Sequence, residues 1–435
     1  MIVSGSNVAA PIDIHDRIQA LVEAGESLGA RPVEEVLEVV AEACRRWREP
    51  GADREAGEEA LAAHYGVPRR SMALILDAAF PIWTLESLRD WIAGELGDPL
   101  ALDGFVPLGG VPSRAFGPRL TVFLAATGVP TTPVADLVSA LCVKSPAWLK
   151  PPSGGDDLVA RFARTVSEVD RRVGNALVVE GWERGSPDGD RVLASADVLV
   201  ATGGAETMTA IRRKISPDTR LVLHGPRMSA AIVLREALDT GAAAVIAGLA
   251  RDTAFAGQMG CLSPIVAYVE SSPHEVADIV EPLHNACVQC WPCAPRSQAS
   301  LAERAAFAEW RGTAGVEAAS GQASWRGDVD SAWTVVARKG AATPEPPTVP
   351  RLLTLMPVGD ATQAVELLTV RRGAIATVGL AGPDARTAEL AGSLADVGVE
   401  RICPLGWMQR PPVAWRRDGR TTFTDLVNWV AIEEP

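Results

Sequence analysis

The segment Gly257-Gln-Met-Gly-Cys261-Leu-Ser-Pro-Ile-Val-Ala-Tyr-Val-Glu270 decides how this chain is interpreted. It places a cysteine between loop-forming residues and a short apolar run, and the glycine-punctuated apolar segment 241–250 precedes it. A thiol at such a junction can project from a loop at the mouth of a cleft, where its thiolate is a nucleophile if the surroundings activate it. The alternative is a buried cysteine that packs as a small hydrophobe.

The composition limits the classes of protein to consider. The chain has 435 residues, which is enough for two or three domains, and 47% of them are hydrophobic, so a large core can form. The formal net charge is −13. Nucleic acids and anionic membranes bind basic surfaces, so neither is an expected partner.

Targeting signals and cysteine usage indicate a compartment. The first residues lack the basic and apolar blocks of a signal peptide, and no run reaches the roughly 18 apolar residues of a membrane span. The seven cysteines fit reduced thiols better than a disulfide framework. We therefore expect a cytoplasmic protein without a membrane span.

Hydrophobic periodicity predicts a helical N-terminal region. Apolar residues recur at spacings of three and four, with charged faces between them, over residues 12–24, 33–47, 55–64 and 85–96.

From residue 119 onward, short apolar runs alternate with helical patterns. We expect strands over 120–126, 147–149, 175–180, 198–202 and 220–223, with helices over 134–141, 157–170, 206–214 and 229–238. After Cys261 we expect strands ending at residue 270 and over 333–337, 352–356, 375–380 and 401–403, and helices over 276–290, 301–310, 361–368, 385–397 and 423–430. This alternation predicts two α/β lobes with parallel sheets.

Three segments could support chemistry besides Cys261. Thr202-Gly203-Gly204 joins a strand to a helix and could bind an anion through backbone N–H groups, although it is not a GxGxxG motif. Lys150 and Ser153 follow another strand, so they could hydrogen-bond a ribose or a phosphate. His224, at a strand end, could act as a base or hydrogen-bond a thiolate. The alternatives are an ordinary tight turn, a solvated lysine and a structural histidine.

The spacing of three cysteines in Cys287-Val-Gln-Cys290-Trp-Pro-Cys293 suggests a metal site. Zinc requires a fourth ligand, and an iron–sulfur pattern would need a cysteine where the chain has Ser297. We expect inert thiols and no metal.

Taken in order, these segments resemble the acyl-CoA reductase (LuxC-like) family of the aldehyde dehydrogenase superfamily. The resemblance covers roughly residues 105 to 432, and its most family-specific parts are Arg401-Ile-Cys-Pro-Leu-Gly-Trp-Met-Gln-Arg-Pro-Pro412 and Trp415-Arg-Arg-Asp-Gly419. It implies an α/β fold like that of aldehyde dehydrogenases, with a small β extension used in oligomers. The domains expected on this basis are a helical region 1–104, a Rossmann-type nucleotide-binding domain 105–240, a catalytic domain 241–410, and a segment 411–435 that packs back or joins an oligomer interface.

The resemblance also implies a reaction. Cys261 would attack an acyl-CoA or acyl-carrier thioester and hold the acyl group, and hydride from NADPH, or alternatively NADH, would reduce it to the aldehyde. Lys150 and Ser153 would contact the adenosine ribose or its phosphate, and Thr202, Gly203 and Gly204 would lie along the pyrophosphate and nicotinamide. A homo-oligomer is expected, with an acyl-donating protein as a further partner.

Three departures from the superfamily pattern bear on this interpretation. The glutamate base of hydrolytic aldehyde dehydrogenases is absent, because the matching positions are Leu223 and His224, and this favours thioester reduction over aldehyde oxidation. The asparagine that supports the oxyanion is replaced by Gly128. Either Thr127 or backbone amides compensate, or the chemistry is altered. The superfamily's Glu-x-Phe-Gly clamp on the nicotinamide ribose is not evident either. An acyltransferase without hydride transfer and a non-catalytic member of a biosynthetic complex therefore remain alternative functions.

Overall fold

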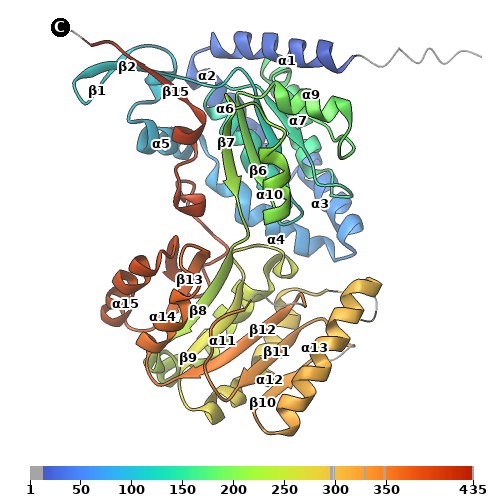
Figure 1. Cartoon of the computed structure of the whole chain (residues 1–435), viewed down its shortest axis with the longest axis vertical. Helices are drawn as coiled ribbons and strands as arrows, with labels where there is room; N and C mark the ends of the chain where they lie inside the picture. Colours follow the sequence, from blue (N-terminus) through green and yellow to red (C-terminus); the bar gives the residue numbers. More distant parts are fainter. Residues whose placement is uncertain (1–12, 294–296, 298, 328–329, 346–348, 434–435) are drawn as a thin grey trace, which may run out of the picture.

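The computed structural model of the chain describes residues 13–293, 297, 299–327, 330–345 and 349–433. It forms two lobes, joined at a narrow waist (Figure 1). The upper lobe in that view contains the N-terminal helices, a five-stranded sheet and a three-stranded sheet, and the lower lobe contains a seven-stranded sheet. The prediction of an α/β protein with two lobes is confirmed.

The N-terminal helices pack against the first sheet as part of one core. They are α1 (Ile14–Gly29), α2 (Val33–Arg48), α3 (Ala52–Tyr65), α4 (Arg69–Ala79) and α5 (Leu85–Leu96), with the 3₁₀ turns η1 (Phe80–Ile82) and η2 (Pro99–Leu102). Trp47 of α2 is buried and its indole N–H donates to Thr165 Oγ1, on a helix that covers the first sheet, at 3.1 Å. The sequence did not predict α4, which begins directly after the break at Gly66-Val67-Pro68.

The five-stranded sheet is parallel throughout. Its strands are β3 (Thr121–Leu124), β4 (Ala147–Lys150), β5 (Leu177–Val179), β6 (Val198–Thr202) and β7 (Arg220–His224), in the order β5-β4-β3-β6-β7. The connecting helices are α6 (Thr132–Cys142), α7 (Leu158–Val169), α8 (Arg171–Gly174), α9 (Pro187–Ala194) and α10 (Ala205–Arg212). The strand order reverses between β3 and β6, and at such a point open α/β sheets form a ligand crevice at the carboxyl ends of the strands.

The seven-stranded sheet has the order β10-β11-β12-β9-β8-β13-β14, with only the β10–β11 pair antiparallel. Its strands are β8 (Met228–Val233), β9 (Pro264–Glu270), β10 (Ala323–Arg326), β11 (Thr334–Arg338), β12 (Leu352–Val358), β13 (Ile375–Ala381) and β14 (Arg401–Pro404). The helices of this lobe are α11 (Arg235–Ala254), α12 (Pro273–Cys290), α13 (Leu301–Ala319), α14 (Ala361–Thr369) and α15 (Asp384–Val397).

The expected helix over residues 229–238 is wrong up to residue 234, and only its last four residues are helical, as the start of α11. Residues 228–233 form β8, which pairs in parallel with β9 and β13 and is buried along its whole length. A parallel strand covered on both faces is a continuous apolar run, which periodicity alone cannot distinguish from a buried helix. Because β8 belongs to the second sheet, the chain passes between lobes at residues 225–227, before residue 241, where we expected the catalytic domain to begin.

The chain returns to the upper lobe at its end. After the 3₁₀ turn η5 (Arg417–Gly419) and the short helix α16 (Phe423–Leu426), β15 (Asn428–Ala431) pairs antiparallel with β2 (Val111–Phe116), which also pairs with β1 (Val106–Leu108). The expected helix over residues 423–430 is therefore wrong beyond Leu426, because pairing with β2 overrides the local helical pattern. This return brings residues 405–426 past the space between the lobes (Figure 1).

No single helix among the described residues is long and apolar enough to cross a membrane. One bent pair, Arg69–Ile82 with Leu85–Leu96, passes that test only when taken together, and its two parts meet at 60°. The faces of this pair that include Ile75 and Ile92 are buried in the protein core.

Candidate active site

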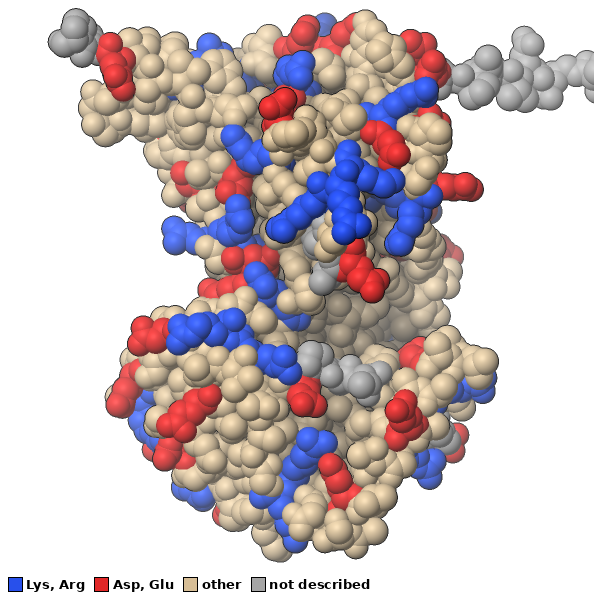
Figure 2. Space-filling model, viewed as in Figure 1, with Lys and Arg blue, Asp and Glu red and all other residues tan. Residues whose placement is uncertain are grey.

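A pocket of about 810 Å³ lies between the carboxyl ends of the upper parallel strands and the start of the lower sheet. Its walls come from helices α4, α5 and α6, the loops after β3, β6 and β7, the loop before β9, residues 371 and 374 before β13, and the returning segment 409–426. Figure 2 shows the surface hollowed between the lobes, with lysine and arginine side chains gathered above the hollow despite the net negative charge.

The loop that carries Cys261 is held rigidly at one end. Ala256, Gly257 and Gln258 all have positive φ, at 51°, 65° and 65°. Two of these are not glycine, and such conformations persist where the surroundings impose them. Here the Gln258 side-chain amide accepts from Leu352 N at 2.8 Å and donates to Leu352 O at 2.9 Å, which ties the loop to the first residue of β12.

Cys261 itself faces the pocket. Its side chain is accessible to solvent, and its carbonyl oxygen accepts a hydrogen bond from Ser229 Oγ at 2.6 Å. Surrounding protein atoms partly desolvate the thiol and raise its pKa, while the charge of Arg417 and the Cys261 amide N–H lower it. The negative charges of Asp418 and Glu400 raise the pKa of this thiol.

The turn after β3 packs directly against this loop. A Cβ built on Gly260 would lie 3.0 Å from Val129 Cγ2, so a side chain at Gly260 would press on the turn. At Gly128 the nearest atom to such a Cβ is Met259 O, at 3.9 Å. The position has room for a side chain, and the missing asparagine is not explained by crowding. Thr127 is exposed and lines the pocket.

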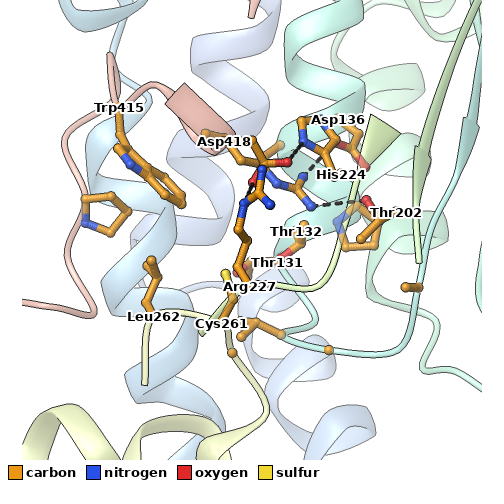
Figure 3. Close-up of a pocket in the computed structure, with 18 of the residues that line it drawn as sticks. Thr131, Thr132, Asp136, Thr202, His224, Arg227, Cys261, Leu262, Trp415 and Asp418 are labelled. Atoms are coloured by element: carbon orange, nitrogen blue, oxygen red, sulfur yellow. Dashed lines mark hydrogen bonds and ion pairs between the residues drawn. The ribbon is translucent and has the colours of Figure 1, made fainter. Parts of the chain in front are cut away.

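His224 belongs to a network of ionisable groups on one wall of the pocket (Figure 3). Its Nδ1 lies 2.7 Å from Asp418 Oδ2, and Asp418 Oδ1 accepts from Arg227 Nε at 3.2 Å. Arg227 also pairs with Glu400 at 2.8 Å. Burial by itself raises the pKa of Asp418, but the hydrogen bond with His224 and the nearby positive charges outweigh it and leave that pKa below its usual value.

A second set of contacts joins the returning segment to the upper sheet. The Arg417 guanidinium donates to Thr202 Oγ1 at 3.1 Å and lies 3.8 Å from Asp136 Oδ1. Burial raises the pKa of Asp136, against the charges of Arg417 and His224. Residues from α6, β6 and the C-terminal segment therefore meet on the wall that faces Cys261.

The crevice at the strand-order reversal has the features of a dinucleotide site. Gly204 is the N-cap of α10, where no side chain caps the helix, and open space surrounds the position of a Cβ. Backbone N–H groups there are available to a phosphate. Lys150 ends β4 with its Nζ 5.8 Å from the centre of the Trp182 ring, and Ser153 is exposed in the turn that follows. These residues fit a nicotinamide dinucleotide.

The structure brings most of the predicted site residues together. Cys261, His224, Thr127, Thr202 and Gly203 line the one pocket. Gly204, Lys150 and Ser153 lie along the same edge of the upper sheet, outside the pocket lining.

The sequence reading assigned no role to four charged residues of the pocket wall, which are Asp136, Arg227, Arg417 and Asp418. Two of these residues, Arg417 and Asp418, lie in Trp415-Arg-Arg-Asp-Gly419, one of the segments most specific to the family, and this could have marked them as functional.

Cys287, Cys290 and Cys293 are respectively buried, exposed and partly exposed at the end of α12. Within the described part of the chain, no group of three or more histidine, cysteine or acidic residues is arranged to hold a metal ion.

A buried carboxylate anchors the returning segment to the lobe that carries Cys261. Asp252 of α11 accepts hydrogen bonds from the N–H groups of Gly406 and Met408, the latter at 3.1 Å. Burial raises the pKa of Asp252 to about 7, although these two donors favour the carboxylate.

The pKa of Asp252 predicts a dependence of stability on pH. The pKa of Asp252 in the folded state lies above the unfolded value of about 3.9, so the folded state binds the proton more tightly than the unfolded state does. Protonation of Asp252 therefore stabilises the folded state. This stabilisation is fully present below about pH 4 and is lost as the pH rises through 7. The free energy of unfolding is measured in urea at pH 5.5 and pH 8 for the parent and for Asp252→Asn. Between these two pH values it should fall more in the parent than in Asp252→Asn. A constant difference between the two proteins at both pH values would contradict this assignment.

Comparison with known proteins identifies similar sequences. The model of a family described as acyl-CoA reductase (LuxC) matches residues 28–429. A long-chain acyl-protein thioester reductase of Photorhabdus luminescens is 29% identical over 195 residues, which are 43% of this chain and only 39% of that protein. The enzyme of the same name from Aliivibrio fischeri is 24% identical over 357 residues, covering 80% of this chain and 71% of the relative.

Solved structures share the fold. A NAD-dependent benzaldehyde dehydrogenase from Corynebacterium glutamicum aligns with a TM-score of 0.68 at 16% identity, over 100% of this chain and 93% of that one. An acetylating aldehyde dehydrogenase from Geobacillus thermoglucosidasius aligns with a TM-score of 0.68 at 15% identity, over 97% and 96% of the two chains. The predicted aldehyde dehydrogenase-like architecture is thereby confirmed.

Proposed function

Because the chain belongs to the acyl-CoA reductase (LuxC) family, we propose that it reduces an acyl thioester to the aldehyde through an acyl-enzyme on Cys261. The observation that carries the proposal is the position of Cys261. Its thiol opens into a pocket that is also lined by Thr202 and Gly203, at the dinucleotide crevice, and by apolar side chains of α4 and α5.

The chemistry follows from these positions. The Cys261 thiolate attacks the thioester carbonyl, a carbon–sulfur bond to the enzyme forms, and the original thiol departs with the electron pair and takes up a proton. A nicotinamide dinucleotide held at Thr202, Gly203 and Gly204 would supply the hydride for reduction of this acyl group to the thiohemiacetal. The Cys261–carbon bond then breaks, which releases the aldehyde and restores the thiolate. His224 is close enough to the pocket to exchange the proton of the thiohemiacetal oxygen, with Asp418 fixing the orientation of its ring.

The absence of a carboxylate base at Leu223 supports reduction over hydrolysis. A hydrolytic aldehyde dehydrogenase must activate water against the acyl-enzyme. Leu223 ends in an apolar side chain, and the adjacent His224 is engaged by Asp418. The position that carries the carboxylate base in hydrolytic aldehyde dehydrogenases is therefore apolar in this chain.

We propose a long-chain acyl group as the substrate. The pocket wall beyond Cys261 includes Ile75, Ile82 and Trp83 of the N-terminal helices, and Phe255 and Leu262 of the cysteine loop. Burial of each methylene in such a pocket contributes about 0.8 kcal/mol, so affinity should rise with chain length. The long-chain acyl-protein thioester reductases named above support this class, and the acyl donor is a CoA or a protein thioester.

NADPH is the proposed cofactor, with NADH as the alternative. Thr202, Gly203 and Gly204 would hold the pyrophosphate and nicotinamide portion, and Lys150 and Ser153 the adenosine ribose or its phosphate. The uncapped start of α10 supports this placement.

The proposal is tested by following absorbance at the nicotinamide band with acyl-CoA thioesters of increasing chain length, and by trapping the aldehyde. We expect NADPH to be consumed in proportion to aldehyde formed, with kcat/KM rising with chain length. Transfer of the acyl group to another acceptor without NADPH consumption would instead establish an acyltransferase.

A further inference from the structure

The tight turn Arg417–Gly419 carries Arg417, a charged residue of the pocket wall that has no role in the proposed reaction. Asp418 has a φ of 56°, in the left-handed region that is unfavourable for a residue other than glycine. The strain is sustained because Asp418 is held by His224 and Arg227 while Arg417 is held by Thr202. Arg417 and Asp418 both line the pocket, and Figure 3 shows Asp418 next to His224.

Arg417 retains donors for a ligand. A guanidinium has five N–H groups. In the described part of the chain, Arg417 makes one side-chain hydrogen bond, to Thr202, and its nearest carboxylate, on Asp136, lies 3.8 Å away. Burial raises the pKa of Asp136, while the charges of Arg417 and His224 lower it.

The other charged groups around Cys261 are engaged with one another, and two of them, Asp418 and Glu400, raise the pKa of its thiol. Arg227 lies between Asp418 and Glu400, at 3.2 and 2.8 Å, and Arg420 pairs with Asp425 at 2.7 Å. The remaining ionisable groups that line the pocket are Asp136 on α6, His224 on β7 and Arg371, whose Nε donates to Pro344 O. Arg417 lines the same pocket as Cys261, and its positive charge lowers the pKa of that thiol.

We propose that Arg417 takes the place of the amide donor that is missing at Gly128, and that its positive charge stabilises the thiolate of Cys261 and the oxyanion that forms when this thiolate adds to a thioester carbonyl. In that step the sulfur–carbon bond forms, the carbonyl electron pair moves to oxygen, and the leaving thiolate departs when the carbonyl is restored. Asp418 and Thr202 are positioning residues that fix the turn and the guanidinium. The oxyanion part of the proposal rests on the proposed function, whereas the thiolate part does not.

The test compares Arg417→Met with Arg416→Met, which removes the same charge from the exposed neighbouring residue. Iodoacetamide alkylation of Cys261 is followed by peptide mass spectrometry from pH 6 to 10 in the full chain. In Arg417→Met we expect the thiol pKa to rise by about one unit, which slows alkylation about tenfold at neutral pH. Arg416→Met and Arg417→Lys, which keeps the cation, should titrate like the parent.

The outcomes separate the two parts of the account. An unchanged alkylation profile in Arg417→Met, or an equal shift in Arg416→Met, would overturn the role of Arg417. If Arg417→Met folds as judged by its melting curve and shows the shift, acylation by an acyl thioester should also slow about a hundredfold. If the parent is alkylated in the predicted way but accepts no thioester, the proposed function fails while the assignment of Arg417 to the thiolate stands.

Discussion

Replacement of Cys261 by alanine is expected to abolish thioester reduction, with a loss in kcat/KM of about 10⁴-fold or more. Among the described residues that line the pocket, Cys261 is the only cysteine, so no second thiol there can take over its role. The measurement is steady-state NADPH oxidation with a long-chain acyl-CoA. Cofactor binding, followed by protein fluorescence, should remain within about twofold of the parent because the dinucleotide residues are untouched.

Cys290 provides the matched control for this variant. It is also an exposed thiol, but it lies at the end of α12, away from the pocket. Cys290→Ala should retain full activity. Substantial activity in Cys261→Ala, or an equal loss in Cys290→Ala, would exclude the covalent mechanism proposed here.

Replacement of Trp47 by alanine should cause the largest loss of stability, about 3–5 kcal/mol in the free energy of unfolding. Trp47 is 1% exposed, stacks on Phe80 with ring centroids 5.7 Å apart, and donates to Thr165 Oγ1. A Cβ on Gly57 would lie 2.3 Å from its ring, so α3 is packed directly against it. Removing the indole opens a cavity where the N-terminal helices meet the first sheet. Since domains unfold with only about 5–15 kcal/mol of stability, this is a large fraction of the total.

Urea unfolding followed by far-ultraviolet circular dichroism measures the effect. Trp407→Ala, at a tryptophan that is 53% exposed, should change the free energy of unfolding by less than about 1 kcal/mol. Trp47→Phe keeps most of the ring and should lie between the two. If Trp47→Ala were no less stable than Trp407→Ala, the N-terminal helices would not form part of one core with the first sheet.

Local patterns in the sequence predicted most of the secondary structure. The amphipathic segments in the N-terminal region correspond to α1, α2, α3 and α5, and the runs that end at Thr202 and His224 are β6 and β7. The errors arose where tertiary pairing decides the outcome. The run at 228–233 is apolar throughout because β8 is covered on both faces, and β15 is a strand only because β2, more than 300 residues earlier, accepts it.

Only some residues of the candidate site could be identified from the sequence. Cys261, Thr202 and His224 could be recognised because each follows or precedes a short apolar strand, where polar residues reach the edge of a sheet. Arg417 and Asp418 could not be placed, because the contacts that give them a role join them to residues about 190 to 280 positions earlier in the chain. Hydrophobic periodicity indicates local secondary structure and does not predict contacts between residues so far apart in the sequence. The expected homo-oligomer and cytoplasmic location remain predictions.

The most direct test of the central claim is the intact mass of the protein after incubation with a long-chain acyl-CoA, before and after addition of NADPH. The account predicts a mass increase equal to one acyl group on the parent and none on Cys261→Ala. Addition of NADPH should then return the protein to its original mass with release of one equivalent of aldehyde. An adduct that forms on both proteins, or one that NADPH does not discharge, would contradict a reductase that works through Cys261.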